Sequence, residues 1–447
     1  MMTSSDLPPG WIRRDVGTVH LNLPEAWEAV AAPQATAAFA HPALDGLGFR
    51  PNVVIRESVY SSSAAALAAY SLATTRAVFN NCYFVSHDEV EIDGTEGRRQ
   101  RYTYDGGGFS LVVERFLLVR GGHALELTTT APIWMAYEVL EGNAFVAGSL
   151  SWDRTGPAHA PGPADADPAS GIREPRHDPW LTELAGHPVE DLSKLPAVQA
   201  FSSEGPLLDA ATVEFLLQQH KRHRLGRFDL LSHQPMVDRL VEAELMEQDG
   251  RFGKSLEFMF GALREPDFTV AVDGRHEGVG TSLRVYAGAG RALVLAGAAA
   301  SELVHGTGPG ERVPEGSARF DVVGIEALPA LIAAWAGVGP AWSVAGNVTR
   351  LAAGDFLLGC DGTLQPPGDA DAASRRLIEQ PWFAWNMSIE GTGFERSWLN
   401  AGAAGQYAVG ALDDGGTEMS PVPSVQVWDV LMQELGAATI ARPADRN

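Results

Sequence analysis

A proline-rich segment divides this chain and limits what it can fold into. Residues 153–178, DRTGPAHAPGPADADPASGIREPRHD, contain five prolines with Gly, Ala and Asp and show no apolar periodicity. This composition is typical of a semi-extended linker. The sequence therefore predicts two domains, at 1–152 and 207–440, separated by a linker and an ambiguous segment that together span 153–206. A chain of 447 residues is long enough for each domain to have a sizeable core.

The first domain shows an α+β pattern dominated by alternating strands. Residues 64–79 are helix-like, with Leu67, Tyr70, Thr74 and Val78 on one face. The predicted strands lie at 52–59, 84–92, 99–104, 109–119, 124–130 and 150–152, and a second helix is predicted at 133–146. Asp93-Gly94 is typical of a tight hairpin turn. We expect an antiparallel sheet flanked by helices.

The second domain combines amphipathic helices with alternating strands. Residues 236–245 and 256–263 each place their apolar side chains on one helical face, and residues 268–272 alternate as a half-buried strand does. Further strands are predicted at 282–286, 292–296, 302–305, 317–323, 383–389, 394–400, 406–412 and 416–419, and further helices at 325–335, 371–379 and 424–435. The order of helices and then strands occurs twice, which suggests an internal pseudo-repeat, although the similarity between the halves is too weak to establish one.

The net charge of −23 bears on possible partners. An acidic surface repels phosphate backbones and anionic lipid, so we expect neither a nucleic-acid partner nor a stable membrane anchor. Acidity also keeps a protein soluble. The two cysteines, Cys82 and Cys360, are too few and too far apart for a disulfide framework or a zinc site. The N-terminal residues MMTSSDLPPGW lack a basic region followed by an apolar core, so we expect no signal peptide and a cytoplasmic location.

One basic cluster stands out against this acidic background. It comprises His220, Lys221, Arg222, His223, Arg224 and Arg227. Lys221, Arg222 and Arg224 are candidate contacts for an acidic partner segment. The alternative is a solvated helix C-terminus, where cations complement the helix dipole. His220 and His223 have no evident third ligand nearby, so a metal site is not expected.

An aromatic cluster near the C-terminal end supplies the second set of candidates. It comprises Trp382, Phe383, Trp385, Trp398, Tyr407 and Trp428. If some of these rings are exposed, they could anchor a hydrophobic helix of a partner, as Trp and Tyr do in interfaces. The alternative is that they fill the core of the late sheet.

Local motifs for catalysis or cofactor binding do not appear in the sequence. No glycine run has the pattern of a phosphate loop or a dinucleotide fingerprint, and there is no G-x-S-x-G elbow. His87, Asp88, Glu89, Glu91 and Asp93 resemble metal ligands. On a strand, however, residues 87, 89, 91 and 93 share one face, which predicts a solvated polar edge with Val90 and Ile92 pointing inward. We therefore expect no cofactor, no metal and no catalytic residue.

Two family resemblances add to this interpretation. The strand PNVVI, the segment VEIDGTEGRR and the run RYTYDGGGFSLVVERFLLVRGGHALELTTTA resemble the PsbP-like superfamily, which includes DcrB-like and LpqN-type domains. Residues 236–274 and the ending SWLNAGAAGQYAVGALDDGGTEMSPVPSVQVWDVLMQEL resemble the EspG-type proteins of type VII (ESX) secretion, with Gly405-Gln406-Tyr407 at the family's Gly-Arg-Tyr element. The second resemblance implies recognition of a helical hairpin substrate.

The resulting hypothesis is a non-enzymatic cytosolic chaperone or adaptor whose partner is a secreted helical protein or a secretion component. The first alternative is an enzyme with an acidic site between its domains, which would contain carboxylates with raised pKa values. The second alternative is a structural subunit with a large self-complementary apolar patch.

Overall fold

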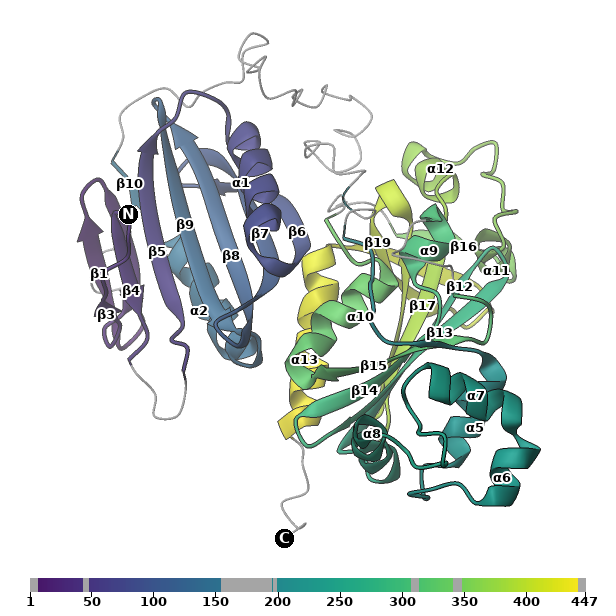
Figure 1. Cartoon of the computed structure of the whole chain (residues 1–447). Helices are drawn as coiled ribbons and strands as arrows, with labels where there is room; N and C mark the ends of the chain where they lie inside the picture. The colour runs from purple at the N-terminus through teal and green to yellow at the C-terminus, as the bar shows by residue number, and fades with distance from the viewer. Residues whose placement is uncertain are drawn as a thin grey trace. The chain divides into compact units, whose positions relative to one another are not determined.

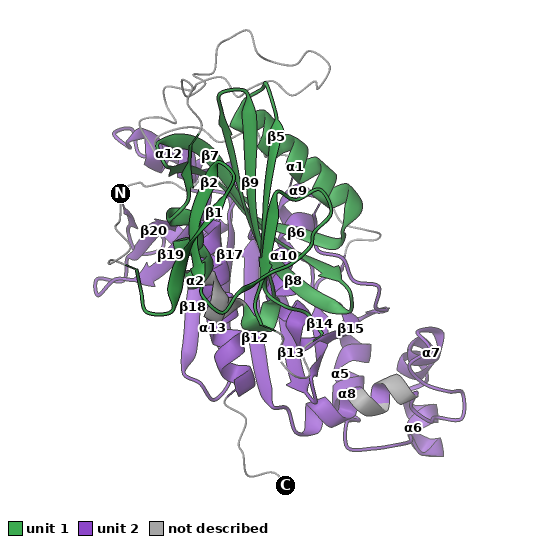
Figure 2. Ribbon diagram, turned by 90° about the vertical axis from the view of Figure 1, so that its left-hand side faces the viewer, with its two compact units in different colours: residues 1–193, 340–343 green, residues 194–339, 344–447 purple. Residues whose placement is uncertain are grey.

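The computed structural model describes residues 7–42, 48–153, 195, 199–306, 313–340 and 348–440. Its secondary structure combines helices with antiparallel sheets, so the fold class is α+β as predicted (Figure 1). The chain forms two compact units, 1–193 with 340–343 and 194–339 with 344–447, which Figure 2 distinguishes by colour. The predicted linker lies mostly outside the described residues.

Unit 1 is built on a seven-stranded antiparallel sheet in the order β3-β4-β5-β9-β8-β7-β6, with a small sheet β1-β2-β10 beside it. Its elements are β1 (Trp11–Val16), β2 (Val19–Pro24), β3 (Glu28–Ala29), β4 (Ala37–Ala40), β5 (Asn52–Val59), α1 (Ala64–Val78), β6 (Asn80–Ile92), β7 (Thr95–Gly106), β8 (Phe109–Arg120), β9 (His123–Pro132), η1 (Ile133–Met135), α2 (Ala136–Gly148) and β10 (Ser151–Trp152).

The two faces of this sheet have different covers. On β8, Leu117 packs in one cluster with Leu67 and Ala68 of α1. Its neighbours Phe116 and Leu118 belong to a second cluster, which includes residues of β2 and α2. Because successive side chains of a strand point to opposite faces, α1 covers one face, and α2 with the small sheet covers the other. The Asp93-Gly94 hairpin between β6 and β7 is confirmed, since both residues have positive φ.

The helix α1 buries only Leu67 of the four residues predicted to share one face. Tyr70 and Val78 are mostly exposed, whereas Ser71 and Thr75 are buried. The sheet face below α1 carries the polar side chain of Arg115, which donates hydrogen bonds to both hydroxyls. The helix therefore turns its small polar side chains inward, and the prediction from apolar periodicity was wrong here.

The prediction of a solvated polar face on β6 is also wrong in part. His87 is 2 % exposed and hydrogen-bonds through its ring to the Gln100 side chain. Asp88, on the opposite face, is nearly buried and accepts a charged hydrogen bond of 2.9 Å from Arg99. Glu91, near the end of the strand, and Asp93, in the turn after it, are exposed as predicted.

Unit 2 is built on a ten-stranded antiparallel sheet in the order β11-β15-β14-β13-β12-β17-β18-β19-β20-β16. Its elements are β11 (Leu207–Leu208), α5 (Ala210–Gln218), α6 (Arg227–Ser232), α7 (Gln234–Glu242), α8 (Lys254–Arg264), β12 (Phe268–His276), β13 (Val279–Gly288), β14 (Arg291–Ala296), α9 (Ala300–His305), β15 (Ala318–Gly324), η2 (Ile325–Ala327), α10 (Leu328–Ala336), β16 (Thr349–Leu351), α11 (Asp355–Cys360), α12 (Ala372–Ile378), β17 (Phe383–Ile389), β18 (Phe394–Asn400), η3 (Gly402–Ala404), β19 (Gln406–Ala411), β20 (Thr417–Val422) and α13 (Ser424–Ile440).

The sheet of unit 2 contains two four-stranded meanders joined side by side, with β11 at one edge and β16 at the other. One runs from β12 to β15 and the other from β17 to β20, and β12 pairs antiparallel with β17 where they meet. A helix precedes each meander (α8 and α12), and a helix follows each one (α10 and α13). This arrangement corresponds to the internal pseudo-repeat suggested by the order of elements in the sequence.

One predicted strand of unit 2 is a helix. Residues 302–305 belong to α9, which begins at Ala300 and ends at Gly306 in the left-handed conformation. Short apolar runs do not distinguish a buried helix turn from a strand. The preceding alanines and the C-terminal glycine favour the helix.

Candidate functional site

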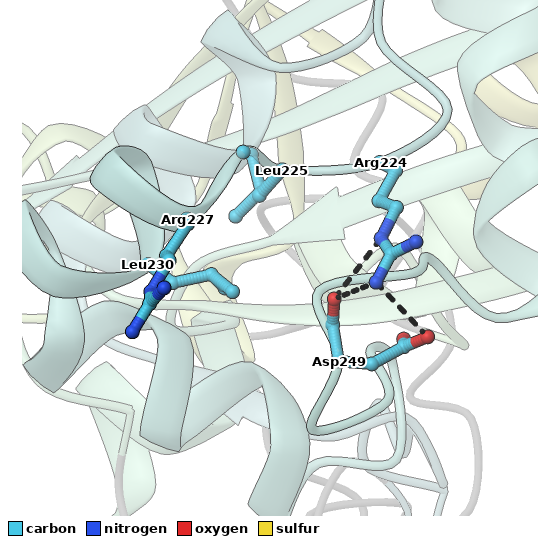
Figure 3. Close-up of a pocket in the computed structure, with 6 residues that line it drawn as sticks. Arg224, Leu225, Arg227, Leu230 and Asp249 are labelled. Atoms are coloured by element: carbon cyan, nitrogen blue, oxygen red, sulfur yellow. Dashed lines mark hydrogen bonds and ion pairs between the residues drawn. The ribbon is translucent and has the colours of Figure 1, made fainter.

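A pocket of about 590 Å³ lies on the helical part of unit 2, where α5, α6 and α7 group together beside α8. Its lining residues are Arg224, Leu225, Gly226, Arg227, Leu230 and Asp249 (Figure 3). Arg224 and Asp249 lie on one side of the pocket in this view, and Arg227 and Leu230 lie on the other. The pocket thus combines cationic, apolar and acidic side chains.

Local sequence signals position the loop that forms this pocket. Asp209 caps α5 by accepting a hydrogen bond of 2.9 Å from the Thr212 amide. After α5 ends, the chain turns back so that the Leu225 amide donates to the Gly250 carbonyl at 2.9 Å. The Leu225 side chain is buried and anchors the loop in the core. Gly250 has a φ of +83°, which favours glycine, and a Cβ at this position would lie 3.1 Å from the Leu225 carbonyl oxygen.

Arg224 is held in a defined position by Asp249. Its Nε and Nη2 atoms donate to the Asp249 backbone carbonyl at 3.1 and 3.0 Å, and Nη2 lies 3.3 Å from the carboxylate. Arg251 contacts the same carboxylate at 3.6 Å. Two guanidinium groups therefore share one carboxylate, which leaves a positive charge at this side of the pocket.

The remaining cations extend this positive charge. Arg222 pairs with Asp229 at 2.7 Å. Within the part of the chain that the structure describes, Lys221 and Arg227 form no ion pair, and both are exposed. Residues 218–235 contain four Lys or Arg and one Asp, a local net charge of +3 in a chain of net charge −23. This surface therefore attracts anionic groups, whereas the chain as a whole repels them.

The short helix α6 presents apolar side chains next to these cations. Phe228 is 86 % exposed and Leu231 is 66 % exposed. They are three positions apart, so they lie on the same side of the helix. We use the term α6 surface for this group of exposed residues: Lys221, Arg222, Arg224, Arg227, Phe228 and Leu231.

Three of the candidate residues predicted from the sequence belong to the α6 surface, namely Lys221, Arg222 and Arg224. The sequence analysis missed Phe228 and Leu231. Their signal was the R-F-D-L-L run directly after the basic cluster. The exposure of these two side chains follows from the helix being only six residues long, with no buried residue.

The aromatic candidates have a different location. Trp382, Phe383, Trp385, Trp398 and Tyr407 are all between 0 and 5 % exposed, so the core-filling alternative describes their place in this structure. Trp385 stacks on Trp398 with ring centroids 4.4 Å apart, and Phe383 packs edge-on against Trp335 at 5.7 Å.

The other two aromatic candidates lie in a separate core cluster. Trp382 donates from its indole nitrogen to the Leu377 carbonyl at 2.8 Å, and Tyr407 belongs to the same cluster. Burial raises the pKa of Tyr407 to about 12. These two side chains therefore join the sheet to α12 and do not form a binding surface in this structure.

Two general findings concern other kinds of site. Among the described residues, no group of three or more His, Cys, Asp or Glu side chains is arranged to hold a metal ion. No helix among those residues has the length and apolar character needed to cross a membrane.

Comparison with known proteins finds solved structures that match at low scores. The sequence matches no family model and no curated protein. Among solved structures, a protein of unknown function from Pseudomonas aeruginosa, PA94, described as a putative regulator, is 16 % identical and has a TM-score of 0.25; the match covers 32 % of this chain and 99 % of that one. LpqN of Mycobacterium tuberculosis, involved in cell envelope biogenesis, is 10 % identical, with coverages of 32 % and 89 % and a TM-score of 0.27. The cyanobacterial PsbP of Synechocystis sp. PCC 6803 is 12 % identical, with coverages of 34 % and 98 % and a TM-score of 0.27.

The structural neighbours therefore include LpqN and a PsbP protein, at low identity and over about a third of the chain. This is the coarse form of the first predicted resemblance. The EspG-type resemblance of the C-terminal part stays a prediction. At these scores, the likenesses carry no conclusion about function.

Proposed function

We propose that this protein is a non-enzymatic adaptor that binds a helical segment of another protein at the α6 surface. The observation that supports the proposal is the exposure of Phe228 and Leu231 beside a cluster of cations. Aromatic side chains and arginines are enriched at protein interfaces, and Leu231 extends the apolar area beside Phe228. The spacing of the two anchors suits a partner helix with its own apolar stripe.

The charge of the α6 surface defines the partner further. A local charge of +3 complements a partner whose apolar stripe is flanked by acidic residues. The rest of the chain is acidic and repels extended anionic surfaces such as a lipid bilayer or a nucleic acid. A secreted helical hairpin protein of a type VII-like system, as implied by the EspG-type resemblance, is the first partner to test, with the protein acting as its cytosolic chaperone.

The experiment compares the tagged full-length protein with the variant Phe228→Ser/Leu231→Ser by affinity purification from the native host, followed by mass spectrometry. The control is Tyr70→Ser, which removes a similarly exposed ring, 65 % accessible, from unit 1. We expect one partner in stoichiometric amount with the wild type and the control, and its loss from the double variant. The interaction is then reconstituted from purified proteins, where the double substitution should weaken the Kd by tenfold or more.

Two outcomes would overturn the proposal. One is a partner whose Kd is the same for the wild type and the double variant. The other is binding to vesicles of anionic phospholipid that depends on Phe228 and Leu231, because it would make α6 a lipid-binding element. If the tagged wild-type protein and the Tyr70→Ser control both purify without a partner, this result would favour the enzymatic alternative.

A further inference from the structure

The pocket beside α6 lies next to the proposed anchors and differs from them in chemistry. Arg227 and Leu230 line the pocket, whereas Phe228 and Leu231 are exposed on the neighbouring side of the same helix. A partner helix seated on the anchors therefore has a side chain within reach of the pocket. The pocket has a volume of about 590 Å³ and is open to solvent, so a side chain of a bound partner can enter it from the surface.

The charges in the pocket favour a singly charged anion. Asp249 contributes one negative charge, but Arg224 and Arg251 both contact it. Arg227 adds a further positive charge that no described residue neutralises. The carboxylate of Asp249 would repel a phosphate group, which carries up to two negative charges, more strongly than it would repel a carboxylate.

Arg227 is better suited than Arg224 to bind this anion. Arg224 already donates from two of its nitrogens to Asp249, so a ligand there would share it with an acidic neighbour. Arg227 donates no hydrogen bond to any residue that the structure describes, and a guanidinium group can donate two parallel hydrogen bonds to one carboxylate. Leu225 and Leu230 supply an apolar lining for the methylene groups of an acidic side chain.

We infer that the pocket receives the carboxylate of a Glu or Asp side chain of the partner helix, held by Arg227, with Arg224 fixed as the second cation. This inference rests on the proposed function, because the α6 anchors bring the partner to the pocket. The same carboxylate chemistry could come from a free small acid, and the experiment separates the two sources.

The experiment starts from a displayed library of 20-residue helical peptides. Peptides are selected on the full-length wild-type protein and depleted on Phe228→Ser/Leu231→Ser. We expect the retained peptides to share an acidic residue at a fixed distance from two apolar positions. The Kd values of a retained peptide and its acid-to-amide form are then measured against the wild type, Arg227→Gln and Arg227→Lys. The control is Arg239→Gln, which removes an exposed cation of α7 that pairs with Glu242 outside the pocket.

We expect the change from acid to amide to weaken binding to the wild type and to Arg239→Gln by about tenfold, and to change binding to Arg227→Gln by less than about twofold. Arg227→Lys should give an intermediate loss, since a lysine keeps the charge without the paired donors. An equal acid-to-amide effect in the wild type and Arg227→Gln would overturn the inference, as would retained peptides without a shared acid. Both of these results leave the proposed function standing.

A further pair of outcomes concerns the source of the carboxylate. If glutarate alone raises the Tm of the wild type but not of Arg227→Gln, the pocket binds a free acid and the inference about the partner is wrong. If every peptide selected on the wild type also binds Phe228→Ser/Leu231→Ser, so that none is retained, the proposed function itself fails. We expect Arg227→Gln to keep the wild-type Tm without ligand, because Arg227 is exposed.

Discussion

Arg101 and Glu114 form an ion pair across β7 and β8 with an N–O distance of 2.5 Å, and their side chains are only 6 % and 2 % exposed. Removing one partner of such a pair leaves a buried charge without compensation. We therefore expect Arg101→Met to lower the free energy of unfolding by about 3–5 kcal/mol, measured by urea denaturation of the full chain. The double variant Arg101→Met/Glu114→Leu should recover most of this loss, because neither charge remains. A single variant as stable as the wild type would show that the carboxylate finds another partner or water.

A second prediction concerns the junction between the two meanders of unit 2. A Cβ added at Gly274 would lie 2.5 Å from the Phe383 ring and 3.1 Å from the Trp335 ring. Both rings are buried, so they cannot move aside without disturbing the core. We expect Gly274→Ala to lower the free energy of unfolding by about 1–3 kcal/mol, measured by urea denaturation. The matched control is Gly280→Ala, where a Cβ meets no atom within 4 Å; equal effects of the two substitutions would contradict the packing argument.

A third prediction concerns pH. His20 contacts Asp153 through Nε2 at 2.8 Å and Asp15 through Nδ1 at 2.6 Å. The hydrogen bond with Asp153, followed by that with Asp15, raises the pKa of His20 above its ordinary value of 6.5. A raised folded-state pKa means that the charged histidine stabilises the fold fully below pH 6.5, and that this contribution is lost as the pH rises through the folded-state pKa.

We therefore expect His20→Gln to lower the Tm more at pH 5.5 than at pH 9, measured by calorimetry in matched buffers. The pKa of Asp15 is lowered, mainly by its hydrogen bond with His20, so this carboxylate stays ionised at both pH values. A Tm difference between variant and wild type that is independent of pH would show that the two contacts do not depend on the charge of the imidazole.

The fourth prediction concerns the two thiols. Burial raises the pKa of both Cys82 and Cys360 from 9.0 to about 11. The thiolate is the reactive form, so at pH 8 we expect both thiols to react with a disulfide reagent about 100-fold more slowly than in the urea-unfolded chain. The check is the absorbance change with the reagent in native and in unfolding buffer. A rapid reaction of one equivalent in native buffer would contradict the burial of one thiol.

The sequence predicted the regular parts of this fold well. The alternation Phe383, Trp385, Met387, Ile389 predicted β17 with its observed ends, and Asp93-Gly94 predicted the turn between β6 and β7. These signals are local, because period and turn type depend only on neighbouring residues. The predictions that failed concern side chains whose burial depends on residues of a neighbouring element. The buried face of α1 follows from Arg115 on the sheet below it, which no periodicity within the helix reveals.

In the candidate site, too, the sequence predicted local features but not contacts between residues far apart in the chain. The basic cluster was visible in the sequence, and Lys221, Arg222 and Arg224 lie on the α6 surface. Their neighbour Asp249 was not predicted as part of the site, because it is 25 positions from Arg224 in the sequence. The two residues meet where the chain turns at Gly250. The identity of an aromatic residue does not show whether its side chain is exposed or buried in the folded protein. For this reason the sequence favoured the buried tryptophans as candidate contacts and missed the exposed Phe228.

The junction of β12 and β17 has a mechanical consequence. Six residue pairs, from Val270 with Ile389 to Arg275 with Ala384, join the two meanders into one continuous sheet. A force applied to the helices before β12 and resisted at α13 would load these strands along their length, so several backbone hydrogen bonds would have to break together. The sheet of unit 2 should therefore unfold under a pulling force in one step, at a higher force than either meander alone.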